Sequence, residues 1–255
     1  MPVISPAKNV RQRALSTIEN SLIALASAIR HVKEEPQFKP IPTTMVNRTP
    51  SFRASIDDLG RMLAYALTPH KRRENLLAFL RVSILTMARP DAVHDANRSQ
   101  WDAQHGIFSL NPRGRRQTKK YRATVPIANQ AVWMFQGAGP LVSGSAKKSM
   151  SAMANELGFP GDGESGLKLI RRSMAHIVRG RLEAMEKPID QLEVFLGHRV
   201  VGSVSELYAP FSASYLATAK RVVEEIIDEL ESLAPGSFHH TCTTLGKNVI
   251  PLRRA

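Results

Sequence analysis

Three residues in the C-terminal half of the sequence have the types needed to attack a phosphodiester. Leu196-Gly197-His198 is followed, ten residues after the histidine, by Tyr208, and Arg171 stands 27 residues before the same histidine. A phenol oxygen can act as a covalent nucleophile, and a guanidinium can pair with the phosphate it attacks. The set therefore points to covalent phosphodiester chemistry on DNA.

The composition favours the same polyanionic partner. The chain has 35 Lys+Arg against 22 Asp+Glu in 255 residues, a formal net charge of +13, as expected of a phosphate-backbone binder. No run of about 18 apolar residues is present to span a membrane, and the first residues lack the apolar core of a signal peptide. The single cysteine cannot form an internal disulfide. We therefore expect a cytoplasmic protein that does not act at a membrane.

The elements that position these residues begin after a predicted boundary. Apolar residues three and four apart predict one amphipathic helix over 11–34, and the prolines of 35–54 indicate an extended linker. Ser55 followed by two acids is typical of a helix N-cap, so a helix is expected to about residue 66. A broad apolar face predicts a second helix from about Arg72 to Ala88. Pro90 should stop it there and leave Arg89 at a helix terminus, able to enter a cleft.

The pattern then changes to short β-like runs and back to helices. Runs at 99–102, 106–110 and 121–127 predict a small sheet, with the polar stretch 111–118 as a hairpin tip. The helices expected beyond it are 128–137, 147–157, 167–183, 189–196, 202–208 and 213–233. Residues 234–255 mix Pro, Gly, Thr and basic residues and are expected to form a flexible tail.

The order of these motifs resembles the catalytic domain of the tyrosine recombinase, or phage-type integrase, family. The likeness comprises an arginine after a helix, a lysine-bearing hairpin ending in Val125-Pro126-Ile127, the box from Lys168 to Arg171, Leu-Gly-His, and a tyrosine about ten residues later. It covers roughly residues 55–233. The resemblance implies a mainly α fold with a small antiparallel β-sheet (α+β), preceded by a truncated N-terminal helical region.

The resemblance also implies the site residues. The catalytic set it gives is Arg89, Lys119, Lys168, Arg171, His198 and Tyr208, with Lys120 as an alternative to Lys119. The family's acidic residue usually lies three positions after the first arginine, whereas here position 92 is Ala and Asp91 is two positions after it. Further DNA contacts are expected from Arg113, Arg115, Arg116, Lys120 and Arg172.

These residue types suit the chemistry that the family performs. The two arginines would neutralise the charge that builds on the phosphate, and Tyr208 would form a 3′-phosphotyrosine. The phenol proton would be drawn off with help from Lys168 and His198, and the hairpin lysine would protonate the departing 5′ oxygen. Because side chains supply the positive charge, neither a metal nor a cofactor is expected.

Several alternatives remain open from the sequence. The family usually carries a separate helical core-binding domain, and only residues 1–54 precede the match. This leaves open either a truncated or remnant integrase, with the 11–34 helix as the last helix of that domain, or a chain that starts downstream of a longer reading frame. The chain is then either an active recombinase on double-stranded DNA, a DNA-binding remnant, a type IB-like topoisomerase, or a helical scaffold without chemistry. The resemblance further implies a tetramer on DNA, with the 213–233 helix docked either on its own domain or on a neighbouring protomer.

Overall fold

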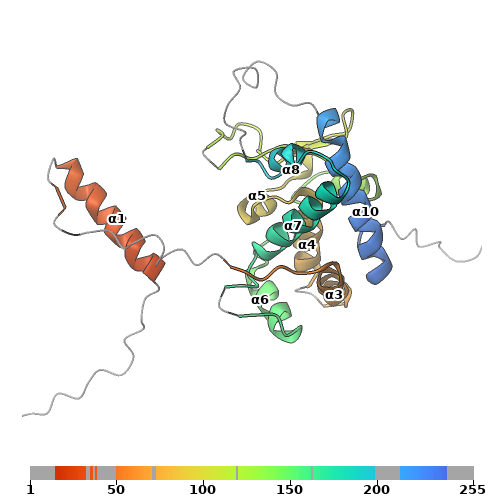
Figure 1. Cartoon of the computed structure of the whole chain (residues 1–255), viewed down its shortest axis with the longest axis horizontal. Coiled ribbons are helices and arrows are strands. Elements are labelled where there is room, and N and C mark those ends of the chain that lie inside the picture. Colours follow the sequence, from red (N-terminus) through yellow and green to blue (C-terminus); the bar gives the residue numbers. More distant parts are fainter. Residues whose placement is uncertain are drawn as a thin grey trace, which may run out of the picture. The chain divides into compact units, whose positions relative to one another are not determined.

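The computed structural model describes residues 15–32, 35–36, 38, 50–70, 73–118, 120–161, 163–198 and 213–239. The chain separates into two compact units, Met1–Ser51 and Phe52–Ala255. The first unit contains helix α1 (Leu15–His31), and the second contains every other element described (Figure 1). The predicted N-terminal helix is therefore present, while the finer division of the chain into domains stays a prediction.

Helix α1 leaves most of its apolar stripe unburied. Ile23 and Leu25 are 55% and 51% exposed, whereas Ala26 is buried. Arg30 and His31 in its last turn complement the negative end of the helix dipole. No described helix, α1 included, is both long and apolar enough to cross a membrane.

The second unit combines helices with one three-stranded antiparallel sheet. In chain order its elements are α3 (Ile56–Leu67), α4 (Arg73–Thr86), α5 (Pro90–His94), the 3-10 helix η1 (Arg98–Gln100), β1 (Trp101–Asp102), β2 (Ile107–Ser109), β3 (Thr124–Pro126), η2 (Asn129–Phe135), α6 (Lys147–Glu156), α7 (Leu169–Ala184), α8 (Asp190–Phe195), η3 (Ala213–Leu216) and α10 (Ala217–Leu233). The predicted class, mainly α with a small antiparallel sheet, is confirmed.

Helix α3 begins where the sequence predicts. The Ser55 hydroxyl accepts from the Asp58 N–H, and the Asp58 carboxylate accepts from the Ser55 N–H, each at 3.1 Å. This reciprocal capping box satisfies two backbone donors that the first turn would otherwise leave unpaired. Further along, a Cβ at Gly60 would lie 2.9 Å from the Leu233 side chain, so the glycine allows α10 to approach α3 closely.

Helix α4 is the central helix of this unit. Its buried side chains, among them Leu76, Phe79 and Leu85, point to several sides, and α4 packs against α3, α5, α6 and α7. It ends at Thr86, and α5 starts with Pro90. The predicted stop before Pro90 is therefore confirmed.

The sheet is small and has the order β1-β2-β3. Phe108 of β2 pairs with Trp101 on one side and Val125 on the other, and both Phe108 and Val125 are fully buried. Strand β3 is shorter than the predicted run because the Arg122 N–H donates to the Gln117 side chain, and the Tyr121 carbonyl accepts from a side chain. Residue 121 is thereby left as loop beside the sheet.

The helices after the sheet mostly follow the prediction. The segment 128–137 forms the 3-10 helix η2 instead of an α-helix, and η3 precedes α10. The helix predicted at 202–208 lies outside the described residues. Helix α10 buries Val222, Ile226 and Leu230 against its own chain, where it contacts α3, α7 and α8. In this single chain α10 packs on its own domain (Figure 1), while docking on a neighbouring protomer stays untested.

The prediction of a flexible tail from residue 234 onward is wrong for residues 234–239. Residues 234–239 pack on the domain: Phe238 is fully buried, and its carbonyl accepts from the Trp133 indole N–H at 2.7 Å. Arg81 donates to the carbonyls of Gly236 and Ser237. Composition misled here, because one buried phenylalanine and these long-range hydrogen bonds order a segment rich in turn-forming residues. The rest of the predicted tail, from residue 240, lies outside the described part.

Candidate active site

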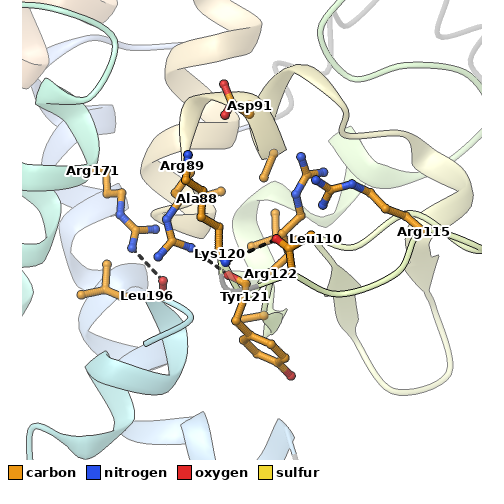
Figure 2. Close-up of a pocket in the computed structure, with 13 residues that line it drawn as sticks. Ala88, Arg89, Asp91, Leu110, Arg115, Lys120, Tyr121, Arg122, Arg171 and Leu196 are labelled. Carbon is orange, nitrogen blue, oxygen red and sulfur yellow. Dashed lines mark hydrogen bonds between the residues drawn. The ribbon is translucent and has the colours of Figure 1, made fainter. Parts of the chain in front are cut away.

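Arg89 stands in the short link between α4 and α5. Met87, just after α4, has a left-handed backbone with φ 48°, and Pro90 holds Arg89 extended at ψ 146° as the N-cap of α5. Its half-buried guanidinium Nη1 donates to the Tyr121 carbonyl at 2.8 Å (Figure 2). The link therefore carries the arginine from the central helix to the edge of the hairpin.

Arg171, in the first turn of α7, connects the same link with the end of α8. Its Nη1 donates to the Met87 carbonyl at 2.6 Å, and its Nη2 donates to the Leu196 carbonyl at 2.7 Å. The carbonyl that accepts the first of these bonds belongs to Met87, the residue with the left-handed backbone. Strained backbone of this kind is often found at functional sites. The guanidinium is thus fixed by two carbonyls from separate segments.

The two guanidiniums share one pocket. Arg89 and Arg171 both line a cavity of about 50 Å³, and Figure 2 shows their guanidinium groups next to each other. Burial, together with the charge of Arg89, lowers the pKa of Arg171 to about 10, although Glu193 acts in the opposite direction. At neutral pH Arg171 is still a cation. Two adjacent cations, partly removed from water, repel each other, so the pocket favours an anion that can pair with both.

His198 reaches this place from the end of α8. The His198 N–H donates to the Glu193 carbonyl, and the Gly197 N–H donates to the Val194 carbonyl, both at 2.9 Å, with Gly197 at φ 66°. This is the Schellman pattern that commonly ends helices. The imidazole Nε2 lies 3.4 Å from Arg171 Nη2, and its Nδ1 lies 2.5 Å from Glu193 Oε2. The Leu-Gly-His motif therefore places a histidine against the second arginine.

Gly197 also allows the end of α8 to approach the hairpin closely. A Cβ at this glycine would lie 2.8 Å from the Tyr121 carbonyl oxygen, the same oxygen that accepts from Arg89. Gly197→Ala is expected to lower the free energy of unfolding by about 2–3 kcal/mol, of which about 1 kcal/mol is left-handed backbone strain. Urea unfolding measures this loss.

Gly158→Ala is the matched control for that variant. Gly158 has φ 72° directly after α6, but a Cβ there would meet nothing within 4 Å. It should lose only the strain of about 1 kcal/mol. If both variants lost the same free energy of unfolding, the close approach of Gly197 to Tyr121 would not contribute to the cost of Gly197→Ala.

The three lysines of the predicted set are less fully placed. Lys119 and the nucleophile Tyr208 lie outside the described residues. Lys120 is exposed and lines the pocket of the two arginines. Lys168, the N-cap residue of α7, is exposed and does not line that pocket. Its backbone carbonyl accepts from the Arg172 N–H at 3.1 Å. A cation at a helix N-terminus opposes the helix dipole, so a bound anion there would be stabilising.

The predicted DNA-contacting arginines fall into two groups. Arg113, Arg115 and Arg116 are exposed on the hairpin, and Arg115 lines the pocket. Arg172 lies elsewhere: it donates to the Glu164 carbonyl at 2.5 Å, and its Nε is buried without a partner. Burial lowers the pKa of Arg172, Arg53 lowers it further, and Glu164 raises it. For Arg172, DNA contact stays a prediction, while its observed contacts join α7 to the preceding loop.

The sequence interpretation missed one charged pair beside the pocket. Arg122 has a side chain only 7% exposed, and its Nη2 binds Asp95 Oδ2 at 2.7 Å. Its Nη1 is buried and has no hydrogen-bond partner among the described residues. Asp95 lies three residues after Ala92, about one helical turn, which was the signal available in the sequence. The C-cap residue of α5 is thus an acid that pairs with the hairpin.

Comparisons with known proteins add the following. No family model and no curated protein matches the chain. Among solved structures it is similar to an integrase from mycobacterium phage Brujita, with 14% identity, a TM-score of 0.49, and coverage of 88% of this chain and 78% of that one. It is similar to XerH site-specific recombinase bound to palindromic difH substrate in a post-cleavage complex (13%, 0.49, 86% and 67%) and to XerA recombinase (13%, 0.42, 80% and 75%). By name all three are recombinases or integrases, the class of protein that the sequence motifs resemble. At these levels of similarity, the function has to be argued from the residues of the site.

Proposed function

We propose that the chain is a site-specific DNA recombinase that cleaves and rejoins DNA through a 3′-phosphotyrosine. The observation that carries this proposal is the pair of adjacent guanidiniums of Arg89 and Arg171 in one pocket, with His198 against the second. Paired guanidiniums match the geometry of a phosphodiester, which presents two non-bridging oxygens. Substrate and partner are thus double-stranded DNA.

The reaction would conserve the phosphodiester bond. The Tyr208 oxygen attacks phosphorus and forms a new P–O bond, while the P–O5′ bond breaks and the 5′ oxygen takes a proton from Lys119 or Lys120. The phenol proton passes to a neighbouring base, and attack by a 5′ hydroxyl reverses every step. Arg89 and Arg171 stabilise the charge on the non-bridging oxygens, a role in which losing one donor typically costs about 10²-fold or more.

A nicked suicide duplex tests this function. On such a substrate the short downstream fragment that carries the new 5′ hydroxyl diffuses away, so a covalent protein–DNA product should accumulate. Mass spectrometry of the digested product should find the DNA on the peptide containing Tyr208. DNA binding without any covalent product would contradict catalysis and indicate a binding remnant. Relaxation of supercoiled DNA that lacks a recombination site would instead indicate a type IB-like topoisomerase.

The salt dependence of DNA binding provides a second prediction. If about six phosphates are contacted, log K should fall against log salt with a slope near −5. Arg115→Ala should reduce this slope by about 1, because Arg115 is an exposed cation at the pocket. Arg179→Ala is the control, since Arg179 already pairs with Glu183 at 2.8 Å on α7. Binding measured by fluorescence anisotropy that did not change with salt would contradict a phosphate-backbone contact.

A DNA-bound tetramer is part of the same proposal. The apolar face of α10 packs on its own domain, so a contact between protomers through this helix would use its exposed polar face. Analytical ultracentrifugation with and without DNA measures the assembly.

A further inference from the structure

We infer that Glu193 is a positioning residue for His198: it fixes the imidazole with its proton on Nδ1 and leaves the Nε2 lone pair beside Arg171. The inference deepens the proposed function and rests on it for the role in catalysis. The protonation pattern itself is a property of the free protein. Glu193 stood outside every motif noted in the sequence.

Two hydrogen bonds join Glu193 and His198. The carboxylate Oε2 of Glu193 lies 2.5 Å from His198 Nδ1, and the Glu193 carbonyl accepts from the His198 N–H at 2.9 Å. Glu193 is in α8 and His198 directly follows the glycine after it, so the helix end fixes their separation. The same turn therefore fixes both the backbone N–H and the imidazole of His198 relative to Glu193.

The donors and acceptors around the ring agree on one tautomer. An ionised carboxylate only accepts, so the hydrogen between Glu193 and His198 belongs to Nδ1. A guanidinium only donates, so the nitrogen facing Arg171 presents its lone pair. The distance from Nε2 to Arg171 Nη2 is 3.4 Å, longer than a normal hydrogen bond. Arg171 therefore faces the Nε2 lone pair without forming a strong hydrogen bond to it. Nε2 can accept a proton from another group.

Stability does not explain the pair. The side chains of His198 and Glu193 are 48% and 39% exposed, and ion pairs open to solvent to this degree contribute little to folding. The charge of Glu193 instead acts within the site, where it raises the pKa of Arg171 against the effect of burial. A carboxylate that orients a histidine and stabilises its imidazolium is a recurring catalytic arrangement.

In the proposed reaction this arrangement identifies His198 Nε2 as the acceptor of the Tyr208 phenol proton. As the Tyr208 oxygen bonds to phosphorus, its proton moves to His198 Nε2, which gives an imidazolium paired with Glu193. The leaving 5′ oxygen takes its proton from the hairpin lysine. On rejoining, Nε2 returns the proton to the tyrosine oxygen, so no further reagent is consumed.

Long-range ¹H–¹⁵N correlation spectra of ¹⁵N-histidine-labelled protein test the inference without DNA. The chain has eight histidines, so His198 is assigned by the signals lost in His198→Gln. In its neutral form the wild-type His198 imidazole should carry its proton on Nδ1. Glu193→Gln should give a mixture of tautomers, because an amide can either donate or accept. Glu183→Gln, which removes a carboxylate bound to Arg179, is the matched control and should leave His198 unchanged.

Cleavage of the suicide duplex adds the catalytic readout. Glu193→Gln should slow covalent-product formation about 10- to 100-fold, by analogy with the loss of a carboxylate behind a ligating histidine. DNA affinity should change less than about two-fold, since the phosphate-pairing arginines remain. A wild-type proton on Nε2, a tautomer unaffected by Glu193→Gln, or an unchanged cleavage rate would each overturn the inference. If no covalent product forms in the wild type, the proposed function fails, while the tautomer spectra still decide whether Glu193 positions His198.

Discussion

Replacement of Tyr208 by phenylalanine is expected to abolish the covalent protein–DNA product completely. The phenol oxygen is the only atom of the side chain able to form a bond to phosphorus, and phenylalanine removes that atom with little other change. DNA affinity should stay within about two-fold of the wild type, because the cations that pair with phosphates are untouched. Denaturing gel electrophoresis of a suicide duplex labelled at the 5′ end of the cleaved strand measures the product, because that end stays with the 3′-phosphotyrosine.

The other three tyrosines provide matched controls. Tyr65 stacks against the Arg73 guanidinium at 3.8 Å, and Tyr215 lies on η3. Tyr121 is close to the pocket, but Figure 2 shows its phenol pointing away from the two guanidiniums while its carbonyl accepts from Arg89. The covalent product should therefore form in Tyr65→Phe, Tyr121→Phe and Tyr215→Phe. Loss of the product in Tyr121→Phe alone would show that the nucleophile is misassigned.

Arg171→Met is expected to have the second-largest effect, on both catalysis and stability. It removes one of the two cations at the pocket, so cleavage should fall about 10²-fold or more. It also leaves the carbonyls of Met87 and Leu196 without their donor, in a place that is largely buried. Unpaired buried acceptors cost about 1–3 kcal/mol each, partly offset because a charge no longer has to be buried, so we expect a net loss of about 1–3 kcal/mol in the free energy of unfolding.

Arg89→Met separates these two effects. It should reduce cleavage as strongly as Arg171→Met, but change the free energy of unfolding by less than about 1 kcal/mol. The lost hydrogen bond to Tyr121 is worth about 1 kcal/mol and is offset by relief of repulsion with Arg171. Urea unfolding and the suicide-duplex assay measure the two quantities on the same preparations. Full cleavage activity in either variant would exclude the pair as the phosphate-binding group.

Local features of the second unit could be predicted well because their causes are local. The capping box of Ser55 and Asp58 is encoded within four residues, and Pro90 starts α5 with Arg89 held extended as its N-cap. The prediction failed where distant contacts decide the conformation. Residues 234–239 are ordered by Arg81 and Trp133, which lie more than a hundred residues earlier in the chain.

The sequence by itself determined the residue types at the site and the helix ends that carry them: the arginines at 89 and 171, and the histidine after Gly197. The tertiary structure alone decided what those side chains contact. Arg171 bonds to the carbonyls of Met87 and Leu196, 84 and 25 residues away, and Arg89 bonds to the carbonyl of Tyr121, 32 residues away. Every residue has a carbonyl, so no residue pattern identifies which one will accept. Only the tertiary packing that brings the link after α4, the start of α7 and the end of α8 next to the Tyr121 carbonyl places these acceptors beside the two cations.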